Sequence, residues 1–93
     1  MKELSRYEIN QEVRRALLRH AVDLSQLQYS STGTTVYLFG QLRKETKGDF
    51  TDREVEGMVR ELSRLPGVRE IRFELSNWML MMEPGSFELH KKS

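Results

Sequence analysis

The chain has 93 residues, no cysteine, and a net charge of +1 from 15 basic and 14 acidic side chains. This length allows one small domain with a thin core, which excludes large multi-substrate enzymes. The lack of cysteine excludes disulfide frameworks, cysteine nucleophiles, iron–sulfur clusters and Cys-based zinc sites. About a quarter of the residues are Leu, Ile, Val or Phe, above the level of disordered chains. The near-neutral charge disfavours nucleic-acid binding.

No targeting segment is visible in the sequence. The first ten residues are mostly polar or charged and lack the apolar stretch of a secretory signal peptide. The longest apolar run, residues 78–82, is five residues long, whereas a transmembrane helix needs roughly twenty. We therefore expect one domain over residues 1–93, cytoplasmic as the sequence stands, and periplasmic if it is a domain excised from an exported protein.

The first predicted element is an amphipathic helix. Apolar residues recur at helical spacing from Ile9 to Leu24, which predicts about three to four turns with one apolar stripe. Ser5 and Glu8 have the spacing of a capping box. Asn10 is a competing cap, so the sequence leaves the start of this helix open.

A β-hairpin is predicted next. Residues 27–31 and 35–42 alternate in polarity and flank the turn-forming sequence S-T-G-T, a pattern typical of two strands joined by a turn. In the second strand the aliphatic side chains share one face while Tyr37 and Phe39 share the other, because strand side chains alternate. One face of the sheet is therefore expected to be aliphatic and the other partly aromatic.

A charged loop and a second helix follow. Residues 43–49 contain no side chain that could anchor them in a core, which predicts a solvated loop. Thr51 and Glu54 fit a capping box, and Phe50 can act as its hydrophobic staple. The second helix is therefore expected to start at Thr51 and to end at Pro66-Gly67.

The last predicted strand is the most regular one. Residues 68–75 alternate apolar and charged side chains, which indicates one buried and one solvated face. Residues 78–82 resume an alternation after an interruption, and they form either an extension of this strand or a fourth strand. The order α, β, β, α, β predicts an α+β fold, a two-layer sandwich with two helices on one face of a small mixed three-stranded sheet.

Three motifs stand out in the sequence. They are Ile9, Val13 and Leu17 in the first helix, Gly33 followed by V-Y-L-F-G-Q-L at 36–42, and L-P-G-V-R-E-I at 65–71. Together with the αββαβ order, these motifs resemble the BON domain, a small bacterial module. The resemblance covers about residues 8–75 and leaves residues 76–93 as a C-terminal extension. It implies a non-catalytic module, many of whose members are thought to associate with phospholipid or other envelope surfaces.

Arg14, Arg15 and Arg19 form a candidate lipid- or anion-binding patch on the first helix. Each basic side chain near an anionic membrane surface contributes about 1 kcal/mol of attraction. The alternative is a solvated helix face on which neighbouring acidic residues such as Glu12 and Asp23 dilute the positive field.

Five apolar residues form the candidate interface. Tyr37 and Phe39 are expected on the sheet face that the helices leave uncovered. Trp78, Leu80 and Met82 share one face of the last segment, and they either fold back over the aromatic pair or meet it across a dimer. A hydrophobic ligand groove is a third use of these side chains.

No arrangement of residues predicts catalysis, a metal site or a cofactor. His20 and His90 have no second imidazole or cysteine at ligand spacing. Asp49 and Asp52 lie at the start of the second helix, where carboxylates stabilise the helix N-terminus. We therefore expect a non-catalytic interaction module that forms a homodimer or docks a protein partner, with peripheral binding to anionic phospholipid as the alternative.

Overall fold

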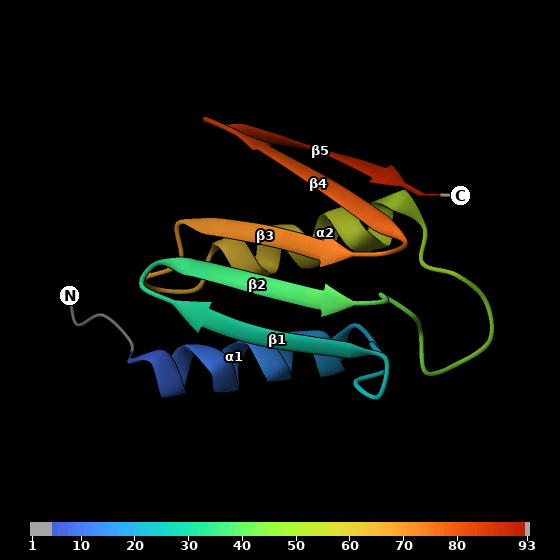
Figure 1. Cartoon of the computed structure of the whole chain (residues 1–93), viewed down its shortest axis with the longest axis horizontal. Helices are drawn as coiled ribbons and strands as arrows, with labels where there is room; N and C mark the ends of the chain where they lie inside the picture. The colour runs from blue at the N-terminus through green and yellow to red at the C-terminus, as the bar shows by residue number, and fades with distance from the viewer. Residues whose placement is uncertain (1–4, 93) are drawn as a thin grey trace.

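The structure is a computed structural model that describes residues 5–92. Residues 1–4 and residue 93 lie outside the described residues. Residues 1–4 are part of the N-terminal segment in which the sequence shows no signal peptide. Two helices lie behind a sheet, and a β-hairpin continues beyond one sheet edge (Figure 1). In chain order the elements are α1 (Arg6–Arg19), β1 (Leu27–Thr32), β2 (Thr35–Gly40), α2 (Asp52–Ser63), β3 (Glu70–Leu75), β4 (Trp78–Glu83) and β5 (Ser86–Lys91).

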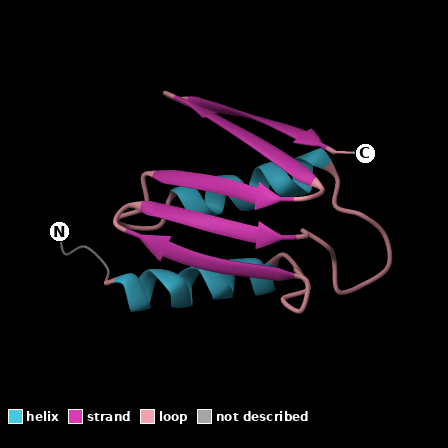
Figure 2. Cartoon of the chain, in the orientation of Figure 1, coloured by secondary structure: helices cyan, strands magenta, loops and turns pink. Residues whose placement is uncertain are grey.

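The central sheet has the order β1-β2-β3. The middle strand β2 pairs antiparallel with β1 and parallel with β3, with Val36 opposite both Ser31 and Ile71. Both helices lie on the same face of this sheet (Figure 2). The predicted α+β sandwich with a mixed three-stranded sheet is therefore confirmed.

The C-terminal segment forms a separate two-stranded sheet, the hairpin β4–β5. Neither sequence interpretation, a strand extension or a single fourth strand, anticipated the second strand of this hairpin. Pro84 and Gly85 form a two-residue turn between Glu83 and Ser86, and Gly85 has a φ of 79°. Since glycine adopts positive φ at little cost, this turn reverses the chain rather than ending the structure.

Both helices begin with the capping boxes that the sequence indicates. Ser5 caps α1 and Thr51 caps α2. Each cap side chain accepts from the amide of the glutamate three residues later, and each cap amide donates to the carboxylate of that glutamate. The helix α1 nevertheless ends at Arg19, so Leu24 lies outside it.

The end of α1 is a Schellman-type stop built on an alanine. The Val22 amide donates to the Leu17 carbonyl at 3.0 Å, and the Ala21 amide donates to the Leu18 carbonyl at 3.0 Å. Ala21 has a φ of 59°, the conformation that glycine usually supplies at this position. Val22 is fully buried, which fixes the direction in which the chain leaves the helix.

The core lies between the helices and the sheet. Ser31 is the one buried residue with a polar side chain among the described residues, and its hydroxyl donates to Asn10 Oδ1 at 2.9 Å. The residues with the largest fully buried side chains are Trp78, Leu17, Leu38, Leu42, Met58, Leu62, Ile71, Val13, Val22, Val36, Val55 and Val59.

The charged loop at residues 43–49 stays out of the core, as expected, but ion pairs hold it. Lys44 Nζ lies 2.9 Å from a carboxylate oxygen of Glu54 in α2. Asp49 bridges Arg43 at 3.2 Å and Lys91 of β5 at 2.9 Å. These contacts hold the pKa of the Asp49 carboxyl below its usual value, with the Lys91 hydrogen bond as the main cause.

The hairpin is attached to the sheet through Asn77, the residue that interrupts the alternating pattern. Its side-chain amide donates to the Leu42 carbonyl at 2.9 Å and accepts from the Leu42 amide at 2.9 Å. Its own carbonyl accepts from the Lys92 amide at 2.9 Å. The break in the alternation therefore marks the joint between the two sheets.

Candidate interaction surfaces

Tyr37 and Phe39 lie on the face of the central sheet that the helices leave open. Alternate residues of β2 point into the core, so these two side chains point away from it. Their rings are stacked, with centroids 6.1 Å apart and planes inclined by 16°. Phe39 is 38% exposed. Their cross-strand neighbours on β3 are Arg72 and Glu74.

The helix side of the molecule, opposite to Tyr37 and Phe39, receives the side chains of Trp78, Leu80 and Met82. Trp78 is 1% exposed within the core, and Leu80 packs against the core from the hairpin. The interpretation that this set folds back over Tyr37 and Phe39 is therefore wrong. The physical reason is that β4 continues the sheet layer beyond β3, so its inward face meets the helix side of the sandwich.

The other face of β4 carries the exposed methionines. Met79 is 42% exposed and Met81 is 47% exposed. Because all of residues 78–82 are apolar, the sequence could not indicate which face of the strand would be buried. We define the outer face as Tyr37, Phe39, Met79 and Met81, all of which point away from the helices.

Charged residues lie within and beside the outer face. Arg72 and Glu74 of β3 separate the aromatic pair of β2 from the methionines of β4. Arg72 donates from Nε to Glu70 at 2.8 Å, and this contact raises the pKa of the Arg72 guanidinium. His90 lies 3.6 Å from a carboxylate oxygen of Glu88 on β5. The outer face therefore consists of two exposed apolar groups with charged side chains between and beside them.

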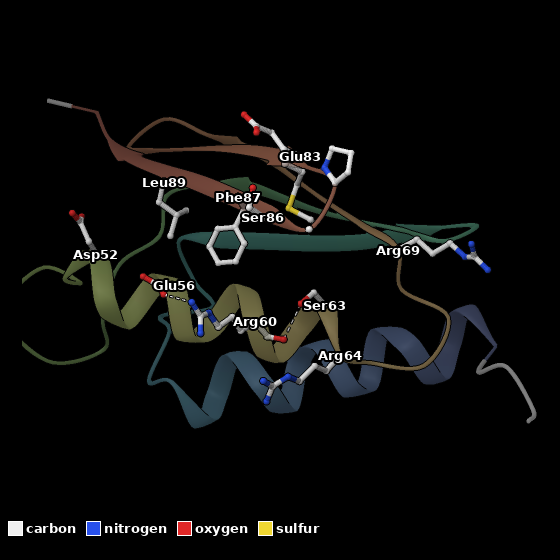
Figure 3. A pocket seen from close by; sticks show the side chains of 13 residues that line it. Asp52, Glu56, Arg60, Ser63, Arg64, Arg69, Glu83, Ser86, Phe87 and Leu89 are labelled. Atoms are coloured by element: carbon white, nitrogen blue, oxygen red, sulfur yellow. Dashed lines mark hydrogen bonds and ion pairs between the residues drawn. The ribbon is translucent and has the colours of Figure 1, made fainter.

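A groove of about 810 Å³ separates α2 from the hairpin (Figure 3). Phe87 and Leu89 of β5 point into it, and Arg60 is bonded to Glu56 at 2.6 Å along its helical wall. The groove lining contains no histidine and no cysteine, and the Ser63 hydroxyl donates to the Arg60 carbonyl at 2.9 Å. Sequence reasoning missed this groove because it needs β5, which was not predicted.

The three predicted arginines of α1 do not act as one free cationic patch. Arg15 lies 2.6 Å from Glu12, and Arg19 is bonded to Glu61 of α2 through two of its guanidinium nitrogens. Arg14 is exposed and has no carboxylate partner among the described residues. Two of the three charges are therefore engaged in ion pairs.

The carboxylate of Glu61 also contacts His20, whose Nε2 lies 3.1 Å from it. Partial burial favours a higher pKa for this carboxyl, but the hydrogen bonds from Arg19 and His20 outweigh it, and the net pKa is below the usual value of 4.5. Since the pKa is lower in the folded than in the unfolded chain, the contact stabilises the fold above about pH 4.5 and is lost at lower pH.

We therefore expect Glu61→Gln to lower the free energy of unfolding at pH 7 by about 0.5–1 kcal/mol. The difference from the native chain should shrink as the pH is lowered from 7 to 3, because the carboxyl takes up a proton as the pH falls through its lowered pKa. Urea denaturation at both pH values measures this effect. The control is Glu12→Gln. Glu12 pairs with Arg15 in the same helix, so we expect a smaller loss of unfolding free energy. A difference of equal size at pH 3 would show that Glu61 acts through packing instead of charge.

Within residues 5–92 no three His, Asp or Glu side chains gather in a way that could hold a metal ion. No helix in the same range is long and apolar enough to cross a bilayer. The chain matches no family model, no curated protein and no solved structure.

Proposed function

We propose that the chain is a non-catalytic, BON-like interaction module that self-associates or docks a protein partner through its outer face. The observation that carries this proposal is the gathering of exposed apolar side chains on one side. Five large apolar residues of the described chain are exposed, and Phe39, Met79 and Met81 are three of them. Exposed apolar side chains that gather on one side of a soluble domain mark interaction surfaces.

The outer face also has the physical properties of a docking surface. The stacking of Phe39 on Tyr37 restricts both rings before a partner arrives, which reduces the entropy lost on association. Methionine side chains adapt to partners of different shape. Burial of one Phe or Met side chain contributes about 1.5–3 kcal/mol, so a few such residues can support association.

The test is sedimentation equilibrium of the native chain and of the double variant Phe39→Ser, Met81→Ser. Both side chains are exposed, so the fold should be retained. We expect the native chain to self-associate and the double variant to associate at least about tenfold more weakly, as when interface anchors are truncated.

The matched control is Leu18→Ser on α1. Leu18 is 45% exposed, so this variant removes a similar apolar surface from another side of the molecule. Association of the control should be unchanged. A native chain that remains monomeric at millimolar concentration would refute self-association and leave a different protein as the partner.

Peripheral binding to anionic phospholipid is the second proposed function. Its support is the resemblance to the BON domain and the exposed, unpaired Arg14 of the described chain. Flotation with anionic and neutral vesicles at low and high salt separates the two functions, because salt screens exposed charges and leaves apolar contacts intact. Salt-sensitive binding to anionic vesicles that Arg14→Glu abolishes would favour the lipid function.

A further inference from the structure

The strands β3 and β4 face each other without pairing. The two belong to different sheets, although only Ser76 and Asn77 separate them in the sequence. Figure 1 shows β4 leaving the end of β3 and diverging from it toward the tip of the hairpin. Two neighbouring strand edges are therefore open toward each other, which natural sheets usually avoid.

On β3 the backbone groups that face this gap belong to Ile71 and Phe73. The amide of Glu70 donates to Thr34 at 3.2 Å and the amide of Ser76 donates to Gly40 at 2.8 Å, so the even-numbered residues bond toward β2. Backbone groups alternate between the two edges of a strand. The amides and carbonyls of the odd-numbered residues therefore point away from β2, toward β4.

On β4 the corresponding groups belong to Leu80 and Met82. The register pairs Glu83 with Ser86 across the two-residue turn, and the Asn77 carbonyl accepts from Lys92. The odd-numbered residues therefore bond toward β5. By the same alternation, the amides and carbonyls of the even-numbered residues point toward β3.

These same residues line a cavity of about 280 Å³ between the strands. Its other lining residues are Glu70, Arg72 and Glu74 of β3. Met82 lines both this cavity and the larger groove above α2. A side chain that enters between the strands on the helix side therefore reaches the apolar surface of the hairpin.

We propose that the slot between β3 and β4 binds an extended peptide strand of a partner protein, with apolar residues facing the helices and basic residues between them. An extended backbone is the ligand that can pair with an open strand edge, as in recognition by strand addition. Its inward side chains would contact Met82 and Phe87. Its outward side chains would lie near Glu74 and Glu83, while the remaining carboxylate, Glu70, is paired with Arg72.

The slot differs from the outer face, so this proposal goes beyond the proposed function. It uses backbone edges and inward side chains, whereas the outer face uses Phe39 and the exposed methionines. Peptide binding in the slot and association through the outer face can therefore fail independently of each other.

The probe is a seven-residue peptide of alternating valine and lysine with blocked ends, titrated into the ¹⁵N-labelled chain. We expect saturable binding, with amide shifts and protection from hydrogen exchange at Ile71, Phe73, Leu80 and Met82. In the free chain the amide hydrogens of these four residues should exchange with solvent faster than the amide hydrogen of Arg72, which bonds toward β2. A matched peptide in which every residue is N-methylated has no amide hydrogen to donate to a strand edge and should bind at least tenfold more weakly.

Two variants test the charge preference and the independence of the slot. Glu74→Lys with Glu83→Lys should reverse the preference, so that an alternating valine and glutamate peptide binds more tightly than the lysine peptide. Phe39→Ser with Met81→Ser should leave peptide binding unchanged.

Three outcomes would overturn the proposal. One is equal binding of the N-methylated peptide, which would show that backbone pairing is not used. Another is a set of amide shifts confined to the residues around Tyr37 and Phe39. The third is equally tight binding of a block peptide with the same composition, three valines followed by four lysines, which would reduce the effect to net charge.

Discussion

Trp78→Ala is expected to lower the free energy of unfolding by about 3–5 kcal/mol, as for other buried large-to-small changes. Trp78 is 1% exposed and is among the largest fully buried side chains. Its loss would leave a cavity where β4 meets the core, and nearby side chains such as Leu80 can fill only part of it. The hairpin would lose its main apolar anchor.

Urea denaturation followed by circular dichroism measures this effect. The urea concentration at the midpoint should fall, while the slope of the unfolding free energy against urea concentration stays similar. The melting temperature should fall by roughly 15–30 °C for a domain of this size. Met79→Ala, on the exposed side of the same strand, should change stability by less than about 0.5 kcal/mol. Similar losses for both variants would contradict the placement of the indole in the core. Substitution of Trp78 therefore tests the core, and the outer face must be tested elsewhere.

Gly40→Ala is expected to be the second large loss. Gly40 has a φ of 97°, and a Cβ atom there would lie 2.5 Å from the Gln26 carbonyl oxygen. That oxygen accepts the Gln41 amide at 2.9 Å, so moving it costs a hydrogen bond. The backbone conformation alone costs about 1–3 kcal/mol for a residue with a side chain, and the lost bond adds about 1 kcal/mol.

Two other glycines make this prediction specific. Gly57 lies inside α2 with open space around it, so Gly57→Ala should stabilise the chain by about 0.5–1 kcal/mol. Gly33 has a φ of 59° and also has open space, so Gly33→Ala should cost less than Gly40→Ala. Equal losses at Gly33 and Gly40 would show that the close approach to Gln26 contributes nothing. Thermal melts of the three variants suffice.

Much of the fold was predictable because local signals were strong. Both capping boxes set helix starts, and the alternation in β3 indicated a half-buried strand. The hairpin was harder because residues 78–82 are apolar on both faces, so the alternation did not reveal which side meets the core. The end of α1 was missed because an alanine, Ala21, takes the position where glycine usually signals a stop.

The candidate surfaces were predictable only in part. The strand period placed Tyr37 and Phe39 on the uncovered face, since the neighbouring aliphatic residues had to enter the core. The pairing of Arg19 with Glu61 could not be foreseen, because it joins residues 42 positions apart. The slot depends on β3 and β4 remaining unpaired, which no local pattern encodes.

The stop at Ala21 has a consequence for the order of folding. The Ala21 carbonyl accepts the Glu45 amide at 2.9 Å, and the Asp23 amide donates to the Arg43 carbonyl at 2.8 Å. Since alanine does not favour positive φ by itself, the last turn of α1 depends on these distant partners to end where it does. We expect an isolated α1 peptide to continue its helix past this point, and the native amides of Val22 and Glu45 to open to exchange together. The helix end would then be acquired late, when residues 43–45 reach it.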